Sequence, residues 1–194
     1  MSQRAHQEMS SYGVAMQLHD QRLRFARDLV FHWSDVRGRD RVLVPFERDL
    51  DLRELERLLH KLSIMDSAAP DDLTVMFMGR DRIEPDLAQA IKGTNWFDLV
   101  PPGARELAKG AYKKLIETPC GVYYHYTGSG PDDFFQEGET LVLPICKGNS
   151  KTPSSTISVR NVLRKQGNVD PSRPPKLEKL QLEYVDIGAG IPQE

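Results

Sequence analysis

Apolar residues recur with helical spacing near the start of the chain. Between Val14 and Arg39, large apolar side chains follow one another at intervals of three, four or seven residues, and charged residues occupy much of the other face. These apolar positions are Leu18, Phe25, Leu29, Trp33 and Val36. We predict a helix whose apolar side needs a cover, preceded by a flexible tail over 1–13.

The period of the pattern changes near residue 60. Asp51 and Glu54 stand in capping-box spacing before a leucine-rich run, which predicts a short helix over 51–59. The segments 62–66 and 73–79 then alternate apolar and polar positions, and a Pro-Asp-Asp turn separates them. This pattern is typical of a β-hairpin.

A helical block and three further strands complete the pattern. A short helix is expected near Pro85 to Gly93, and a longer one over 103–118. Alternating segments that predict strands follow at 121–127, 139–146 and 155–162. Two strands, a helical block and three more strands indicate an α+β fold with a five-stranded antiparallel sheet.

Composition and charge exclude several classes of protein. The 194 residues include 26 Lys and Arg against 28 Asp and Glu, a net charge of −2 that argues against a nucleic-acid partner. No apolar run approaches the length of a membrane span, and the polar first residues carry no signal-peptide core. The two cysteines form no CxxC pair, so we expect a cytoplasmic protein with reduced thiols and no membrane partner.

Four short motifs in a fixed order resemble a PAS domain, and in particular the short stand-alone bacterial PAS proteins. Trp33 precedes "PFERDLDLREL", and "LTVMFMGRDRI", "GTNWFDLVPP" and "ETLVLPICKG" follow. The resemblance covers about residues 18–163, although the segment "KGNSKTPSST" is longer than the turn that the family has there. The expected domains are therefore a helical extension over 14–40, a PAS-like domain over 41–163, and a linker with a C-terminal extension over 164–194. Within that extension, "KLEKLQLEYVDIG" is a candidate for one more strand.

The resemblance implies short helices wrapped over one face of the sheet, around a core or a pocket. It implies a non-catalytic sensory or adaptor domain that binds a small molecule or a protein partner. PAS domains commonly pair through N-terminal helices, so it also implies a homodimer with its seam at Leu18, Phe25, Leu29, Trp33 and Val36. Packing of that helix within one chain is the alternative.

The stretch "CGVYYHYTG" supplies further candidate ligand contacts. Strand alternation sends Tyr124 and Tyr126 to one face of the sheet, and Tyr123 and His125 to the other. The strand has no Lys or Arg between its aromatics, which argues against stacking on bases. We expect these aromatics to fill a core or to line a pocket. The predicted ligand-binding residues are Phe77, Trp96, Tyr112, Tyr123, His125 and Leu143.

No cofactor follows from the sequence. The helix that usually carries the haem ligand in haem-binding PAS proteins has no histidine here, and residues 83–101 lack the cysteine that a flavin photosensor requires. Cys120 and His125 are separated by an odd number of strand positions, so they should face opposite sides of the sheet. We therefore expect no metal ligands and no catalytic residues. The alternative is a small enzyme that uses the cavity, with His125 as its base.

Overall fold

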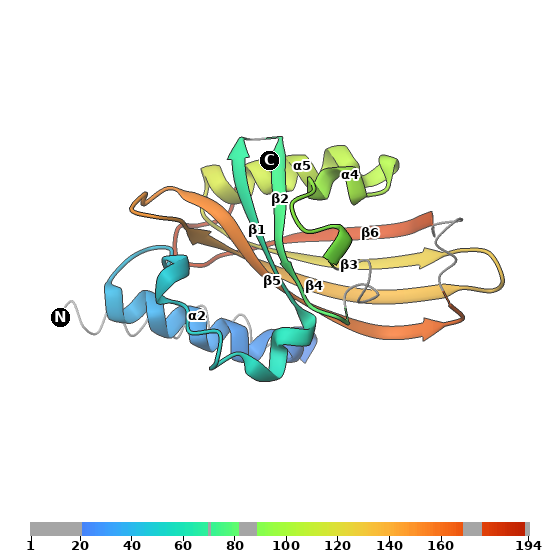
Figure 1. Cartoon of the computed structure of the whole chain (residues 1–194), viewed down its shortest axis with the longest axis horizontal. Coiled ribbons are helices and arrows are strands. Elements are labelled where there is room, and N and C mark those ends of the chain that lie inside the picture. Colours follow the sequence, from blue (N-terminus) through green and yellow to red (C-terminus); the bar gives the residue numbers. More distant parts are fainter. Residues whose placement is uncertain (1–20, 70, 82–88, 169–175, 193–194) are drawn as a thin grey trace.

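A single antiparallel sheet organises the protein. The computed structural model describes residues 21–69, 71–81, 89–168 and 176–192. Its sheet has six strands in the order β2-β1-β5-β4-β3-β6 (Figure 1). The strands are β1 (Leu62–Ala69), β2 (Asp72–Met78), β3 (Gly121–Ser129), β4 (Phe135–Cys146), β5 (Pro153–Gln166) and β6 (Lys176–Val185). The α+β class with an antiparallel sheet is confirmed, and the predicted count of five strands is one too low.

The additional strand comes from the C-terminal part of the chain. β6 pairs antiparallel with β3, and Tyr124 lies opposite Leu182 in that pair. Leu180, Leu182 and Tyr184 repeat every second residue, so β6 turns one partly buried apolar side toward the rest of the protein. The segment that we expected to follow the domain as an extension thus forms an edge of its sheet.

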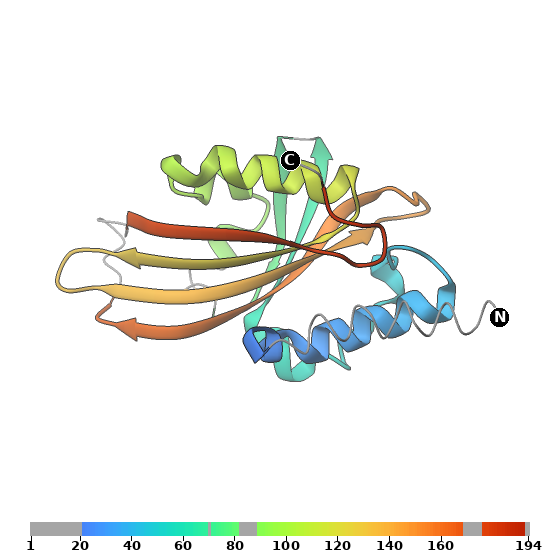
Figure 2. The same cartoon turned by 180° about the vertical axis from the view of Figure 1, so that it is seen from behind.

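Helices lie on both faces of the sheet (Figures 1 and 2). The 3-10 helix η1 (Gln21–Ala26) and α2 (Arg27–Asp40) are packed on one face, which we call the outer face. The helices α4 (Trp96–Leu99) and α5 (Pro102–Glu117) cover the other, the inner face. Two further helices among the described residues are short 3-10 turns, η2 (Glu47–Asp49) and η3 (Glu56–Lys61).

The helix predictions hold in part. α2 and α5 occupy the segments predicted for the two longer helices. The leucine-rich run after Asp51 forms turns at 52–55 and then η3, rather than one α-helix over 51–59. Residues 14–20 and the segment around Pro85 lie outside the described residues.

An apolar core fills the space between α2 and the outer face. From α2, Leu29, Trp33 and Val36 are fully buried in the same cluster as Leu143 and Ile145 of β4. The indole Nε1 of Trp33 donates a hydrogen bond of 2.9 Å to the carbonyl oxygen of Pro144. This bond satisfies the polar edge of a buried indole and fixes α2 relative to β4.

The burial of α2 changes the interpretation of its apolar stripe. Leu29, Trp33 and Val36 are each 0% exposed in a single chain, and Phe25 packs partly buried against the same core. Leu18 lies outside the described residues. Side chains that one chain already buries cannot contact a second copy, so the prediction of an intersubunit seam at Leu29, Trp33 and Val36 is wrong. These three side chains instead follow the alternative, packing of the helix within one chain.

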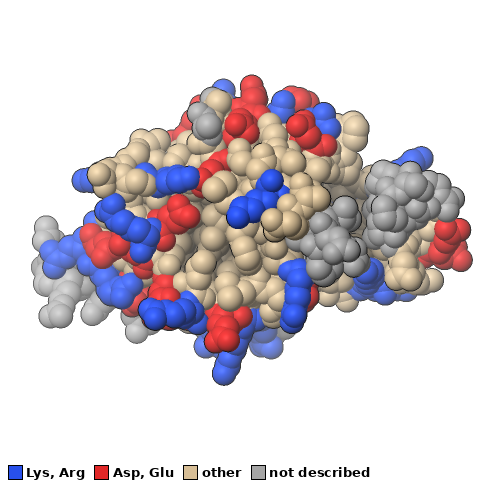
Figure 3. Space-filling model, viewed as in Figure 1, with Lys and Arg blue, Asp and Glu red and all other residues tan. Residues whose placement is uncertain are grey.

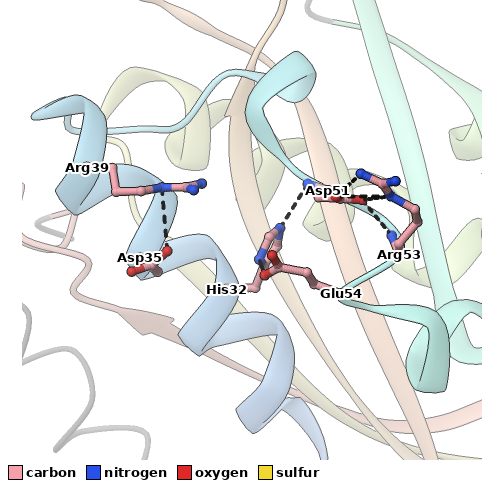
Figure 4. Close-up of polar contacts among 6 residues, drawn as sticks. All are labelled: His32, Asp35, Arg39, Asp51, Arg53 and Glu54. Atoms are coloured by element: carbon pink, nitrogen blue, oxygen red, sulfur yellow. Dashed lines mark hydrogen bonds and ion pairs between the residues drawn. The ribbon is translucent and has the colours of Figure 1, made fainter.

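A polar cluster attaches the middle of α2 to the following loop (Figure 4). The backbone N–H of Asp51 donates to Nε2 of the buried His32 at 3.0 Å, and Nδ1 of His32 lies 2.8 Å from a carboxylate oxygen of Glu54. The side chain of Arg53 donates hydrogen bonds to both carboxylate oxygens of Asp51. These hydrogen bonds from Arg53 lower the pKa of Asp51 to about 2.

Surface charge is mixed in sign. On the face shown in Figure 3, Lys and Arg alternate with Asp and Glu without forming one large field of either sign. On this face the described residues form no continuous basic stripe of the kind expected of a protein that follows phosphates. Within the described part of the chain, no helix is both long enough and apolar enough to cross a membrane.

Candidate functional site

A cavity of about 330 Å³ lies between the inner face of the sheet and the helices α4 and α5. Its volume is at the lower end of the range for small-molecule sites. The helical side is almost entirely apolar, and it carries Trp96, Phe97, Leu99, Val100, Pro101, Ala104, Ala108, Tyr112 and Leu115. A largely apolar cavity of this size can hold a small organic molecule by removing part of its surface from water.

Asn95 fixes the position of α4, which covers one side of this cavity. It is the N-cap of α4, where its side-chain oxygen accepts a 3.0 Å hydrogen bond from the N–H of Phe97. The same side chain donates to the carbonyl of Asp71 at 2.9 Å and accepts from the N–H of Leu73 at 3.3 Å. One residue thus starts the short helix and ties it to the edge strand β2. Phe97 then meets Tyr112 of α5 edge-on, with ring centroids 6.1 Å apart.

The floor of the cavity is more polar than its roof. The inner face of β4 and β5 contributes Gln136, Thr140, Thr156, Ser158 and Arg160. The hydroxyl of Ser158 forms a 2.7 Å hydrogen bond with that of Ser63 on β1. A few fixed polar groups opposite an apolar roof are typical of sites that orient a ligand.

Tyr126 lies across the floor because its cross-strand partner is a glycine. Tyr126 of β3 pairs with Gly138 of β4, and a Cβ at that position would come within 2.4 Å of the Tyr126 hydroxyl oxygen. The ring can therefore reach over β4 toward β5, where the guanidinium carbon of Arg160 lies 5.3 Å from its centroid. The Tyr126 hydroxyl is buried and has no hydrogen-bond partner among the described residues.

Buried phenols in the cavity stay protonated. Burial raises the pKa of Tyr112, and burial together with the neighbouring Tyr184 raises the pKa of Tyr124 strongly. Both side chains line the cavity. They can therefore act there as neutral hydrogen-bonding groups, and they are poor bases at neutral pH.

The structure brings two of the six predicted ligand residues to the cavity. Trp96 and Tyr112 line it, as expected. Phe77 is 37% exposed and does not line it. Tyr123 and Leu143 belong to the outer core, and His125 shares the outer face with Tyr123. The strand was therefore assigned with the wrong face, because Tyr124 and Tyr126 are the aromatics that line the cavity.

The outer-face residues form a separate polar cluster. Tyr123 donates a 3.0 Å hydrogen bond to the buried carboxylate of Glu139, which also accepts a 2.9 Å bond from the side-chain amide of Asn161. Nε2 of His125 lies 3.0 Å from a carboxylate oxygen of Glu137. A histidine paired with a carboxylate is a possible base, but this pair is on the face away from the cavity. It cannot act on a molecule bound there.

Neither cysteine is poised for chemistry. Cys120 and Cys146 are free and buried, and burial raises the pKa of both thiols, that of Cys120 to about 11. Thiolate is the reactive form, so both groups are unreactive at neutral pH. Among the residues that the structure describes, no group of three or more His, Cys, Asp or Glu side chains could hold a metal ion.

Sequence reasoning missed the polar floor and Arg160 above all. A signal was present in β4, where Leu141, Leu143 and Ile145 form a purely apolar stripe while Thr140 and Val142 alternate with them. The purely apolar stripe packs against the apolar side of α2. The mixed stripe is therefore the one that faces the cavity. Comparison of the chain with protein-family models, curated proteins and solved structures finds no match.

Proposed function

We propose that this protein is a non-catalytic sensory domain of the PAS type, which binds a small apolar molecule between α4, α5 and the inner face of its sheet. The cavity of about 330 Å³ carries this proposal, because it combines an apolar roof with a buried Tyr126 hydroxyl that no described residue satisfies. Buried polar atoms are nearly always paired, so an orphan in a cavity wall favours a bound partner.

The arrangement of the elements supports the PAS part of the proposal. The chain makes two strands, a helical block and three strands, and these strands join one antiparallel sheet. The helices α4 and α5 lie over one face of that sheet, as the resemblance implies (Figure 1). The edge strand β6 is an addition to that pattern.

The cavity wall favours binding over catalysis. The described residues that line it include no aspartate, glutamate, histidine or cysteine, so general acid–base or thiol chemistry has no obvious agent there. We therefore propose a receptor function, with a signal that passes onward through a protein partner or through dimerisation. Two free, buried cysteines accord with a reducing compartment, and we place the protein in the cytoplasm.

Affinity selection from a metabolite mixture, read by native mass spectrometry, tests this function. Ala108 is partly buried and lines the cavity, so Ala108→Trp should occupy the ligand's space. Glu106, two residues away on α5, is a matched control because its side chain is 86% exposed. We expect the wild type and Glu106→Trp to retain the same small molecules, and Ala108→Trp to lose them. Retention by all three proteins, or by none, would contradict the proposal.

A further inference from the structure

The charged residues that the structure describes on the cavity wall are cationic. The chain as a whole carries 28 acidic and 26 basic residues. Among the described residues that line the cavity, Arg160 and Lys176 are cationic and none is anionic. In a chain with a slight acidic excess, two cationic residues on the described part of the wall favour a negative group in the ligand.

Arg160 is held in a position suited to this role. It lies on the inner face of β5 among hydroxyl groups of the floor, opposite Thr140 of β4. Its guanidinium stacks on the ring of Tyr126, which itself lies over the glycine of β4. A planar guanidinium that is supported by a ring loses little freedom on binding and can form two parallel hydrogen bonds to a carboxylate.

The remaining groups complete an amphipathic site. The Tyr126 hydroxyl, buried and without a described partner, can donate a further hydrogen bond beside Arg160. Lys176, at the start of β6, is exposed and lines the cavity as well. The other side of the cavity is formed by the apolar residues of α4 and α5. One side thus suits an anionic head and the other an apolar body.

We propose that the cavity binds a small apolar molecule that carries one carboxylate, with the carboxylate at Arg160 and the apolar body beneath α4 and α5. This inference rests on the proposed function and adds the chemical class of the ligand. It also makes Arg160, rather than any residue of the outer face, the main determinant of specificity.

Three naphthalene derivatives with the same apolar body test the inference. Naphthoate is anionic, naphthylmethanol neutral and naphthylmethylamine cationic at neutral pH, and their affinities can be measured by isothermal titration calorimetry. We expect naphthoate to bind about ten- to a hundredfold more tightly than the alcohol, because a hydrogen-bonded charge pair is lost in the alcohol. The amine should bind least well.

Arg160→Gln should remove the preference for naphthoate and leave the affinity for the alcohol nearly unchanged. Arg164→Gln is the matched control, because Arg164 is on the same strand, stacks on Phe135 with 5.4 Å to the ring centroid, and does not line this cavity. It should keep the preference. If Arg160→Gln does not fold, the exposed Lys176→Gln should lower naphthoate affinity by a smaller factor, and added salt should weaken that contribution.

Each outcome decides the question. Equal affinity of the wild type for naphthoate and its alcohol would overturn the anion preference while leaving a small-molecule site in place. Equal loss of the preference in Arg160→Gln and Arg164→Gln would also overturn it. If none of the three compounds binds, the inference fails as stated, and the affinity selection with Ala108→Trp then shows whether the proposed function fails with it.

Discussion

The substitution Leu29→Glu distinguishes an internal core from an intersubunit seam. Leu29 is 0% exposed and belongs to the outer core together with Trp33 and Leu143. Removal of a buried leucine side chain alone costs about 2–5 kcal/mol of the free energy of unfolding. A glutamate here also buries a carboxylate, which adds a desolvation cost. A domain of this kind is typically stable by about 5–15 kcal/mol, so the variant should unfold or lose most of its stability.

Urea denaturation followed by tryptophan fluorescence measures this loss, and light scattering over a range of concentrations measures the oligomeric state. Phe31→Glu is the control, because Phe31 is on the same helix but 44% exposed, and its replacement should change the free energy of unfolding by less than about 1 kcal/mol. The reasoning is refuted if Leu29→Glu is as stable as the wild type and differs only in being a monomer where the wild type is a dimer.

Three further predictions concern Tyr126, the α2 cluster and a thiol. Gly138→Ala should cost about 1–3 kcal/mol, because the added methyl collides with Tyr126, and Tyr126→Leu in the same chain should restore part of that loss in thermal denaturation. His32→Leu should lower the free energy of unfolding by about 1–3 kcal/mol because it leaves the Asp51 N–H unpaired (Figure 4). Arg39→Gln removes only an exposed ion pair of 3.5 Å and should cost under about 1 kcal/mol. Equal losses in urea titrations would contradict this. The pKa of the Cys120 thiol is raised in the folded state from 9.0 to about 11, so the thiol favours the folded state fully below pH 9. As the pH rises toward 11, the free energy of unfolding should fall by up to about 1.4 kcal/mol per pH unit through this group. Cys120→Ala should therefore lose less stability over that range, and an unchanged slope would count against the shifted pKa.

Local patterns in the sequence predicted most of the sheet. The alternation over 62–66 and 73–79 identified β1 and β2, and the aromatic strand identified β3. Each of these segments buries one side, so apolar residues recur at every second position and the sequence alone reveals the strand. The count failed at β6 because its first four residues include three charged ones, Lys176, Glu178 and Lys179, as suits an edge strand, and the apolar side that follows is short.

The site was less predictable because alternation gives two faces without saying what covers each. Tyr124 and Tyr126 share one side of β3, and Tyr123 lies on the other. Only the tertiary arrangement puts α5 over Tyr124 and Tyr126 and α2 over Tyr123. The apolar stripe of α2 likewise required a cover, and a sheet face of the same chain serves as well as a second copy. Arg160 was missed because a single arginine in a strand has no sequence signature, and its neighbour Tyr126 is remote in the chain.

Fluorine NMR of protein labelled with fluorotryptophan tests the central claim most directly, that ligands bind in the inner-face cavity. The chain has two tryptophans, of which Trp96 lines the cavity and Trp33 is buried on the opposite face. Trp96→Phe and Trp33→Phe assign the two signals. Titration with naphthoate should shift the Trp96 signal to saturation and leave the Trp33 signal in place. A saturable shift of Trp33 alone, or no shift of Trp96 at concentrations where calorimetry shows binding, would contradict the account.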